Sequence, residues 1–222
     1  MTLATALDRA HSAEDEWVGA HLLPGDRHYR AYVGPPERYD VVAAMQFNLL
    51  TSLGLRDYHT LLDIGCGSLR LGRLAIPYLR QGRYFGLEPQ AWLIDEGIAR
   101  ECGNDLIVLK RPYFEHNDDF RLTVFGRRFD YLIAQSIFTH AAPGQIRRCL
   151  AEAKNSMHKD SMFVANFIPG TNYEGSAWCY PGCVTYTQAT MQEVADQAGL
   201  MCEALDFPTV NATTWLLYRW ST

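Results

Sequence analysis

Asp63, Gly65 and Gly67 have the types and spacing of ligand-binding residues, and they stand in the segment LLDIGCGSLRLG over residues 61–72. A short apolar run ends in the acid, two glycines follow, and a helical pattern then begins. This order predicts a strand that turns tightly into a helix, because glycine permits a sharp turn and close approach of the backbone to a ligand. The helix start offers free N–H groups. Since an acid at this position repels phosphate and attracts a cation, the motif favours a nucleoside with a positively charged tail.

Glu88 stands at the end of the next predicted strand, over residues 84–87. In a doubly wound sheet the ligand crosses the carboxyl ends of the strands, where an acid accepts hydrogen bonds from ribose hydroxyls. One carboxylate can accept both hydroxyls at once. We therefore expect Asp63 to face the cationic tail and Glu88 to hold the ribose, with Leu87 or Trp92 against one face of the base.

Strand and helix patterns alternate from about residue 59 onward, which indicates a parallel sheet covered on both faces. The predicted strands are 60–63, 84–87, 106–109, 129–134 and 162–167, and the helices between them are 69–79, 91–102 and 143–157. A helix over 187–199 follows, with Thr187 as its cap. Strands over 200–207 and 213–220 are joined by a link too short for a parallel crossover, so we expect an antiparallel hairpin there.

Composition limits the class of protein. The chain has 222 residues, 48% of them hydrophobic and 20% charged, which is the balance of a globular enzyme with one sizeable core. The net charge of −5, without a basic cluster, argues against a nucleic-acid partner. We find no bilayer-spanning apolar stretch and no signal peptide, so we expect no membrane association and a cytoplasmic location. The six cysteines form no Cys-x-x-Cys pair, so free thiols and no metal site are expected.

The segments LLDIGCGSLRLGRLAIPYL, YFGLEP, FDYLIAQSIFTH and TTWLLYRW resemble, in this order, the class I S-adenosylmethionine-dependent methyltransferases, and most closely their bacterial small-molecule branch. The resemblance covers roughly residues 55–220. It implies an α/β fold, a Rossmann-like doubly wound sheet of seven mostly parallel strands with the last strand reversed and helices on both faces. It implies S-adenosyl-L-methionine as cofactor, with S-adenosyl-L-homocysteine as product. Residues 55–222 would form the methyltransferase domain and residues 1–54, with helices over 1–16 and 37–53, an N-terminal helical lid.

The resemblance also assigns cofactor-binding residues by position. These are Asp63, Gly65, Cys66 and Gly67 in the first motif, Glu88 and Pro89 after the second strand, and Gln135 and Ser136 after the fourth. Leu69 replaces the family's usual third glycine, so the loop must be wider there or Leu69 must point inward. The family's usual acid near the end of the third strand is missing from residues 110–114, so we expect Tyr113 or Phe114 to stack on the adenine.

His140 is the candidate catalytic residue, because it follows the fourth strand at the mouth of the expected site. Methyl transfer from a sulfonium depends mainly on alignment of the nucleophile, which can be worth roughly 7–11 kcal/mol. A hydroxyl nucleophile also needs a base, and an imidazole with a pKa of about 6.5 suits that role. The alternative is a histidine that only positions the donor or satisfies local backbone. The aromatic residues of 173–186 are expected to form a substrate wall or to pack internally.

Other classes fit the motifs less well. A nicotinamide-binding site would need glycine where Arg70 stands, and Asp63 would oppose the pyrophosphate. The residues after the fourth strand, 135–138, are neither the Asn/Asp-Pro-Pro-Tyr/Phe of nucleic-acid enzymes nor the Asp of the metal-dependent catechol type. We therefore expect O-methylation of a small molecule, a secondary metabolite (in natural product biosynthesis) or a sugar hydroxyl, by a monomer or homodimer. N-methylation of a small amine, or a non-methylating reaction that uses the bound donor, stays open.

Overall fold

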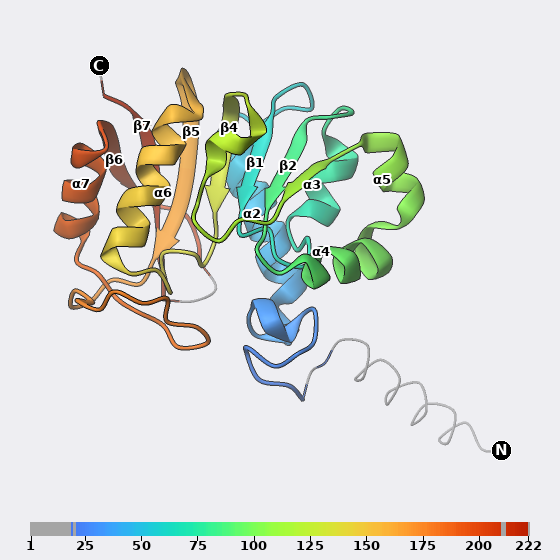
Figure 1. The fold of residues 1–222 in the computed structure, drawn as a ribbon, viewed down its shortest axis with the longest axis horizontal. Coiled ribbons are helices and arrows are strands. Elements are labelled where there is room, and N and C mark those ends of the chain that lie inside the picture. Colours follow the sequence, from blue (N-terminus) through green and yellow to red (C-terminus); the bar gives the residue numbers. More distant parts are fainter. Residues whose placement is uncertain (1–18, 20, 210–211, 222) are drawn as a thin grey trace.

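The computed structural model of the protein describes residues 19, 21–209 and 212–221 (Figure 1). Seven strands form one sheet in the order β3-β2-β1-β4-β5-β7-β6. The strands are β1 Leu61–Ile64, β2 Tyr84–Leu87, β3 Tyr113–Glu115, β4 Phe129–Ala134, β5 Met157–Phe167, β6 Leu200–Leu205 and β7 Thr214–Trp220. The first five pair in parallel, and β7 lies antiparallel between β5 and β6. The predicted fold class and the antiparallel hairpin at the C-terminal end are confirmed.

Six α-helices connect and cover the strands in the described part of the chain. They are α2 Tyr39–Ser52, α3 Gly72–Tyr78, α4 Ala91–Gly97, α5 Asn104–Lys110, α6 Pro143–Asn155 and α7 Gln188–Gln197, and a π-helical turn over Ile98–Cys102 extends α4. The predicted helices are found with ends shifted by a few residues, and the helix expected over 1–16 lies outside the described residues. Thr187 is confirmed as a cap, since its Oγ1 accepts a hydrogen bond from the Thr190 N–H at 3.2 Å.

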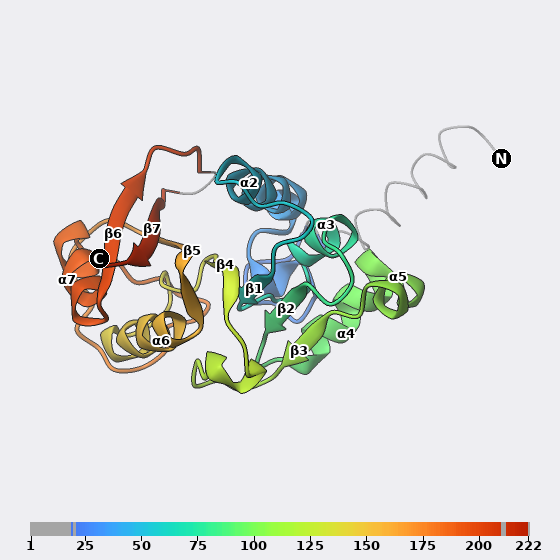
Figure 2. The same cartoon turned by 90° about the horizontal axis from the view of Figure 1, so that it is seen from above.

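The core lies on both faces of the sheet, because side chains alternate along each strand. In β1, Leu62 and Ile64 face one cluster while Leu61 faces the other. Helices α6 and α7 bury their apolar sides in the first cluster, and α2 and α3 bury theirs in the second. Figure 2 shows these two helix pairs on opposite sides of the sheet. Because β1 to β5 run parallel, their carboxyl ends lie at the same end of the sheet, where a ligand can bind.

The third strand was predicted in the wrong place. Residues 106–109, Leu-Ile-Val-Leu, belong to helix α5, and the strand is Tyr113–Glu115. The β-branched run is not a core strand, since Val108 is 73% and Leu109 66% exposed. The helix ends at Lys110 and is capped by Arg111, which has a left-handed φ of 49°, so the chain enters the sheet about one turn later than the apolar run suggests.

An ion-pair cluster fixes the segment before α2 to the rest of the molecule. Arg30 Nη2 lies 2.7 Å from Glu101 Oε1 in the π-helical turn, and Arg73 Nη2 of α3 lies 2.6 Å from Asp40 Oδ1. The Tyr39 hydroxyl donates to the Ser68 backbone oxygen at 2.9 Å. Residues 29–40 are thus held against the loop that follows β1. No helix within the described ranges has the length and apolar character needed to cross a membrane.

Candidate functional site

The loop after β1 turns sharply at two glycines. Gly65 has φ +71° and Gly67 φ +54°, and the Gly65 N–H donates to the Leu87 backbone oxygen at 2.7 Å. A Cβ on Gly65 would lie 2.1 Å from Ile137 Cδ1, and one on Gly67 would lie 2.7 Å from Val33 Cγ1. Both positions therefore require glycine, for backbone conformation and for space. The predicted tight turn between strand and helix is confirmed.

Leu69 occupies the position of the absent third glycine and keeps a glycine-like backbone, with φ +60°. Its side chain is fully buried, so it points inward, which was one of the two expected solutions. Gly97 of α4 makes the room, because a Cβ there would lie 2.3 Å from the Ser68 oxygen and 3.1 Å from Leu69 Cγ. A left-handed conformation costs a non-glycine residue about 1–2 kcal/mol, which burial of the leucine offsets.

Glu88 lies at the carboxyl end of β2 with its carboxylate held by backbone. Its Oε2 accepts from the Gly67 N–H at 3.0 Å and its Oε1 from the Gln90 N–H at 2.9 Å. The side chain is largely buried, and burial raises its pKa while the two N–H groups oppose the rise. Each carboxylate oxygen can accept a further hydrogen bond and Glu88 lines the cavity, so the carboxylate can bind a diol.

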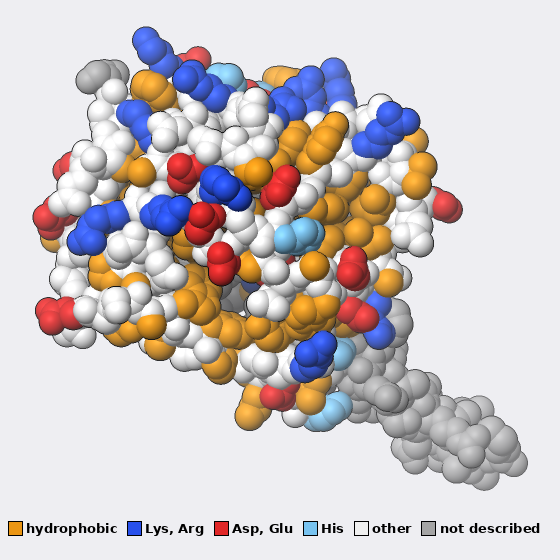
Figure 3. All heavy atoms as spheres, viewed as in Figure 1, with side chains coloured by type: hydrophobic (Ala, Val, Ile, Leu, Met, Phe, Trp, Pro, Cys, Tyr) orange, Lys and Arg blue, Asp and Glu red, His pale blue; other side chains and the backbone are white. Residues whose placement is uncertain are grey.

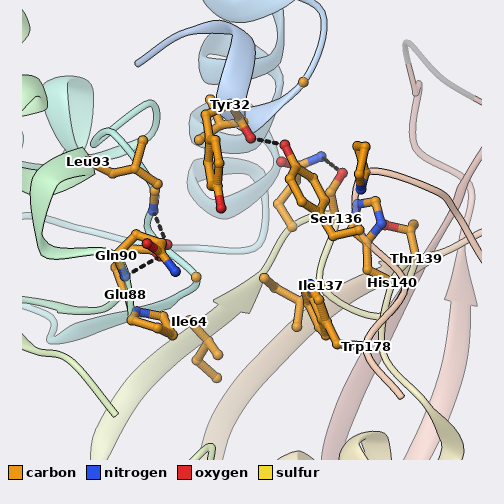
Figure 4. Close-up of a pocket in the computed structure, with 18 of the residues that line it drawn as sticks. Tyr32, Ile64, Glu88, Gln90, Leu93, Ser136, Ile137, Thr139, His140 and Trp178 are labelled. Atoms are coloured by element: carbon orange, nitrogen blue, oxygen red, sulfur yellow. Dashed lines mark hydrogen bonds between the residues drawn. The ribbon is translucent and has the colours of Figure 1, made fainter. Parts of the chain in front are cut away.

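A cavity of about 650 Å³ opens at this edge of the sheet, and a hollow bordered largely by hydrophobic side chains is visible there (Figure 3). That volume is within the range of about 300–1,000 Å³ common for small-molecule sites. Its walls come from residues 24–42, the glycine loop, the ends of β2 and β3, the segment after β4 and the loop 168–183. Figure 4 shows Glu88 on one side of this space and His140 and Trp178 on the other.

His140 is held by the loop that follows β5. Its Nδ1 lies 2.6 Å from the Gly182 oxygen and 3.2 Å from the Cys179 oxygen. Because both neighbours are acceptors, Nδ1 carries the proton and Nε2 keeps its lone pair. Burial lowers the pKa of this imidazole, so it is neutral at pH 7. The geometry gives a neutral histidine at the cavity with an unprotonated nitrogen available as a base.

Arg70, which the sequence analysis considered only as a departure from a nicotinamide motif, is buried at the cavity. Its Nη1 donates to the Val33 backbone oxygen at 2.8 Å and its Nη2 to Gln135 Oε1. Among the described residues it forms no ion pair. Burial lowers its pKa to about 10, so the guanidinium stays charged at neutral pH. Its hydrogen-bond partners are neutral, and the buried Asp63 carboxyl acts on it only through space. A buried cation that forms no ion pair favours an anionic ligand group.

The structure brings together seven of the proposed site residues around the cavity. These are Gly65, Gly67, Glu88, Pro89, Gln135, Ser136 and His140. Asp63 and Cys66 do not line the cavity and are buried. Asp63 Oδ2 accepts from the Tyr84 hydroxyl at 2.7 Å, and burial raises its pKa to about 7. Its carboxylate therefore braces β1 against β2 and does not line the cavity.

Tyr113 and Phe114 lie away from the cavity. The Tyr113 ring stacks on Phe85 at 4.9 Å, and both rings line a second, separate cavity. Phe114 packs edge-on to Tyr84. Because β3 begins later than predicted, the residues that follow it are different, and Asn117 and Asp118 line the cavity beyond Glu88. Asp118 is thus an acid that follows the observed third strand and lines the cavity. Leu87 lines the cavity as well.

Comparison with family models gives no match for this chain. Among solved structures, magnesium protoporphyrin IX methyltransferase (ChlM) from Synechocystis PCC 6803 with bound SAM is 13% identical, with a TM-score of 0.65 over 94% of this chain and 91% of that one. The CcbJ methyltransferase from Streptomyces caelestis is 14% identical, with a TM-score of 0.62 over 85% and 97%. CalO1, a methyltransferase in calicheamicin biosynthesis in its SAH-bound form, is 12% identical, with a TM-score of 0.58 over 93% and 67%. The chain therefore has the fold of the class I methyltransferases.

Proposed function

We propose that this chain binds S-adenosylmethionine at the glycine loop and transfers its methyl group to a hydroxyl of a small molecule. One observation carries the proposal: a single cavity has a backbone-held carboxylate, Glu88, on one side and a neutral imidazole, His140, on the other. An acid at the end of β2 suits a ribose, and a histidine with a free lone pair suits deprotonation of a hydroxyl.

The residues of the first half of the cavity fit the donor. Glu88 would accept the ribose hydroxyls, and Asn117 and Asp118 would lie near the base. Arg70 would pair with the carboxylate of the amino-acid tail, since its own hydrogen bonds go to neutral oxygens. Gly65 and Gly67 leave the loop backbone open to close contact. When bound, S-adenosylmethionine supplies an electrophilic methyl group on a sulfonium.

The residues of the second half would prepare the acceptor. His140 Nε2 would take the proton of the acceptor hydroxyl, while the Gly182 and Cys179 oxygens keep the proton on Nδ1 and stabilise the imidazolium that forms. Residues 29–40 would exclude water from the cavity, because the Arg30–Glu101 ion pair and the Tyr39 hydroxyl hold this segment in place. The protein would act chiefly by alignment, which is the main requirement of a transfer from an already reactive donor.

Titration calorimetry with S-adenosylhomocysteine tests the donor half of the proposal. We expect binding by the unmodified chain and an affinity about 10- to 150-fold weaker in Glu88→Ala, since hydrogen bonds to a charged group are worth about 1.5–3 kcal/mol. Glu203→Ala, an exposed glutamate on β6, is the matched control. Absence of binding at millimolar ligand would rule out the proposal. Accumulation of S-adenosylhomocysteine during turnover would separate methyl transfer from a reaction that leaves the donor intact.

A further inference from the structure

The described charged residues that line the cavity all lie on one side of it. Its charged lining residues among those described are Arg70, Glu88 and Asp118, and all three come from the half built by β1 to β3. The described lining residues between 135 and 213, which we term the acceptor side, include no Asp, Glu, Lys or Arg. A buried ammonium, carboxylate or phosphate needs a partner of opposite charge. The acceptor side therefore fits an uncharged molecule.

Aromatic rings form the wall of the acceptor side. The Trp178 ring lies 5.7 Å from the His140 ring and the Tyr180 ring 5.0 Å from it. Tyr32 continues this wall, 5.4 Å from Tyr180. Trp178 is 41% exposed although it lies beside a buried histidine, so part of its indole surface has no protein neighbour among the described residues. Such a surface favours a flat ring, because aromatic pairs gain energy from offset and edge-to-face contacts beyond the area they bury.

The acceptor side has uncharged polar residues as well as rings, among them Gln135, Ser136, Thr139, Gln145 and Thr213. Thr139 Oγ1 is buried without a hydrogen-bond partner in the described part of the chain, and Figure 4 shows Thr139 beside His140. Thr139 can therefore bind a polar group of the ligand close to the reacting oxygen.

The basicity of His140 also favours a phenol over an aliphatic alcohol. A phenol has a pKa of about 10, as tyrosine does, whereas the pKa of an aliphatic alcohol is far higher, close to that of water. A buried neutral imidazole is a weak base, because burial lowers its pKa. Proton transfer to it during the reaction is far less uphill from a phenol than from an aliphatic alcohol.

We infer that the acceptor is an uncharged phenol whose ring packs against Trp178 and whose hydroxyl hydrogen-bonds to His140 Nε2. This rests on the proposed function. In the reaction the phenol oxygen forms a bond to the methyl carbon as the S–CH₃ bond breaks, the electron pair of that bond stays on sulfur, and the phenol proton passes to His140 Nε2. The products are an aryl methyl ether and S-adenosylhomocysteine.

The test uses the full chain saturated with S-adenosylhomocysteine and three probes, 2-naphthol, methyl glucoside and benzylamine. We expect 2-naphthol to bind at least tenfold more tightly than the other two and to quench tryptophan fluorescence. Trp178→Leu should weaken 2-naphthol binding at least tenfold without changing the affinity for S-adenosylhomocysteine. Trp220→Phe, at the end of β7 beside Lys154, should change neither and serves as the control.

The possible outcomes distinguish failure of this inference from failure of the proposed function. Tighter binding of methyl glucoside or benzylamine, no binding of 2-naphthol, or unchanged 2-naphthol affinity in Trp178→Leu would overturn the inference while the donor site stands. Failure of S-adenosylhomocysteine itself to bind would overturn the proposed function and the inference with it. If Trp178→Leu does not fold, Trp178→Phe takes its place, with a smaller loss expected because a ring remains.

Discussion

The Tyr180 hydroxyl donates a hydrogen bond to the backbone oxygen of Tyr32, across 148 positions of the chain. Tyr180 belongs to the same short loop as Cys179 and Gly182, whose oxygens hold His140 Nδ1. The loop is bound back in turn, because the Cys179 N–H donates to the His140 oxygen at 2.8 Å. The orientation of the candidate base therefore depends on contact between this loop and the segment before α2.

Tyr180→Phe tests this dependence, because it removes the hydrogen bond to Tyr32 and keeps the ring. A typical hydrogen bond contributes about 0.5–1.5 kcal/mol, so we expect kcat to fall about 2- to 13-fold in steady-state assays. The affinity for S-adenosylhomocysteine should change little. Tyr173→Phe is the matched control, since its hydroxyl reaches the Ala177 oxygen at 3.4 Å within the same region. Equal kcat in the two variants would show that the Tyr180 contact does not position His140.

The pH dependence of the reaction should report the lowered pKa of His140. Burial lowers that pKa from its ordinary value of about 6.5. If His140 is the base, as proposed, the reaction requires the neutral ring, so kcat/KM should rise with pH through a pKa below about 6.5 and be level above it. An acid limb centred above pH 7 would contradict this assignment.

The same shift predicts a loss of stability in acid. Below about pH 6.5 the unfolded chain binds a proton at this histidine that the folded chain does not. The contribution to the free energy of unfolding is therefore complete above that pH and is lost as the pH falls toward the folded-state pKa. Urea titrations of the unmodified chain and of His140→Gln at pH 5 and pH 8 should show a smaller pH dependence in the variant. Equal dependence in both would assign the acid sensitivity to other groups.

Arg70→Gln should separate recognition of the amino-acid tail from recognition of the nucleoside. If the guanidinium pairs with the tail carboxylate, the affinity for S-adenosylhomocysteine should fall about 10- to 150-fold, as expected for a charge-assisted bond of about 1.5–3 kcal/mol. The affinity for 5′-methylthioadenosine, which lacks the amino acid, should stay within about threefold of the unmodified chain. Arg80→Gln, an exposed arginine paired with Asp57, is the control. Equal losses for both ligands would instead indicate a collapsed loop.

The sequence was most informative where structure is determined locally. The glycine loop and Glu88 could be predicted because a strand end, a tight turn and an acid lie within a few residues of one another. The environment of His140 could not be predicted, because its tautomer depends on backbone oxygens about 40 residues away in the sequence, at residues 179 and 182. Arg70 could have been noticed as a cation directly after the glycine motif. Only the fold shows that its partners are neutral.

The error in the third strand has a similar physical cause. Residues 106–109 combine β-branched and apolar side chains, which favours a strand by composition alone. They form a helix because the sheet edge is filled by Tyr113–Glu115, with Tyr113 stacked on Phe85 and Phe114 packed on Gly86. The adenine contacts expected at Tyr113 and Phe114 depended on that misplaced strand. Asn117 and Asp118, which follow the observed strand, line the cavity instead of Tyr113 and Phe114.

Gly97 is expected to be as important for stability as either glycine of the loop. Leu69 stands where the family usually has a third glycine, and the space it needs is left by Gly97, whose Cβ would meet backbone at 2.3 Å. Gly97→Ala must therefore displace α4 or the loop, and we expect it to lower the free energy of unfolding by about 1–3 kcal/mol, the usual cost of overpacking. In Gly144→Ala the new Cβ meets nothing within 4 Å, so this position in the first turn of α6 should lose no stability. Urea unfolding of the two variants measures the contrast. Equal stability would mean that α4 yields freely, and S-adenosylhomocysteine affinity in Gly97→Ala would then show whether the loop moves with it.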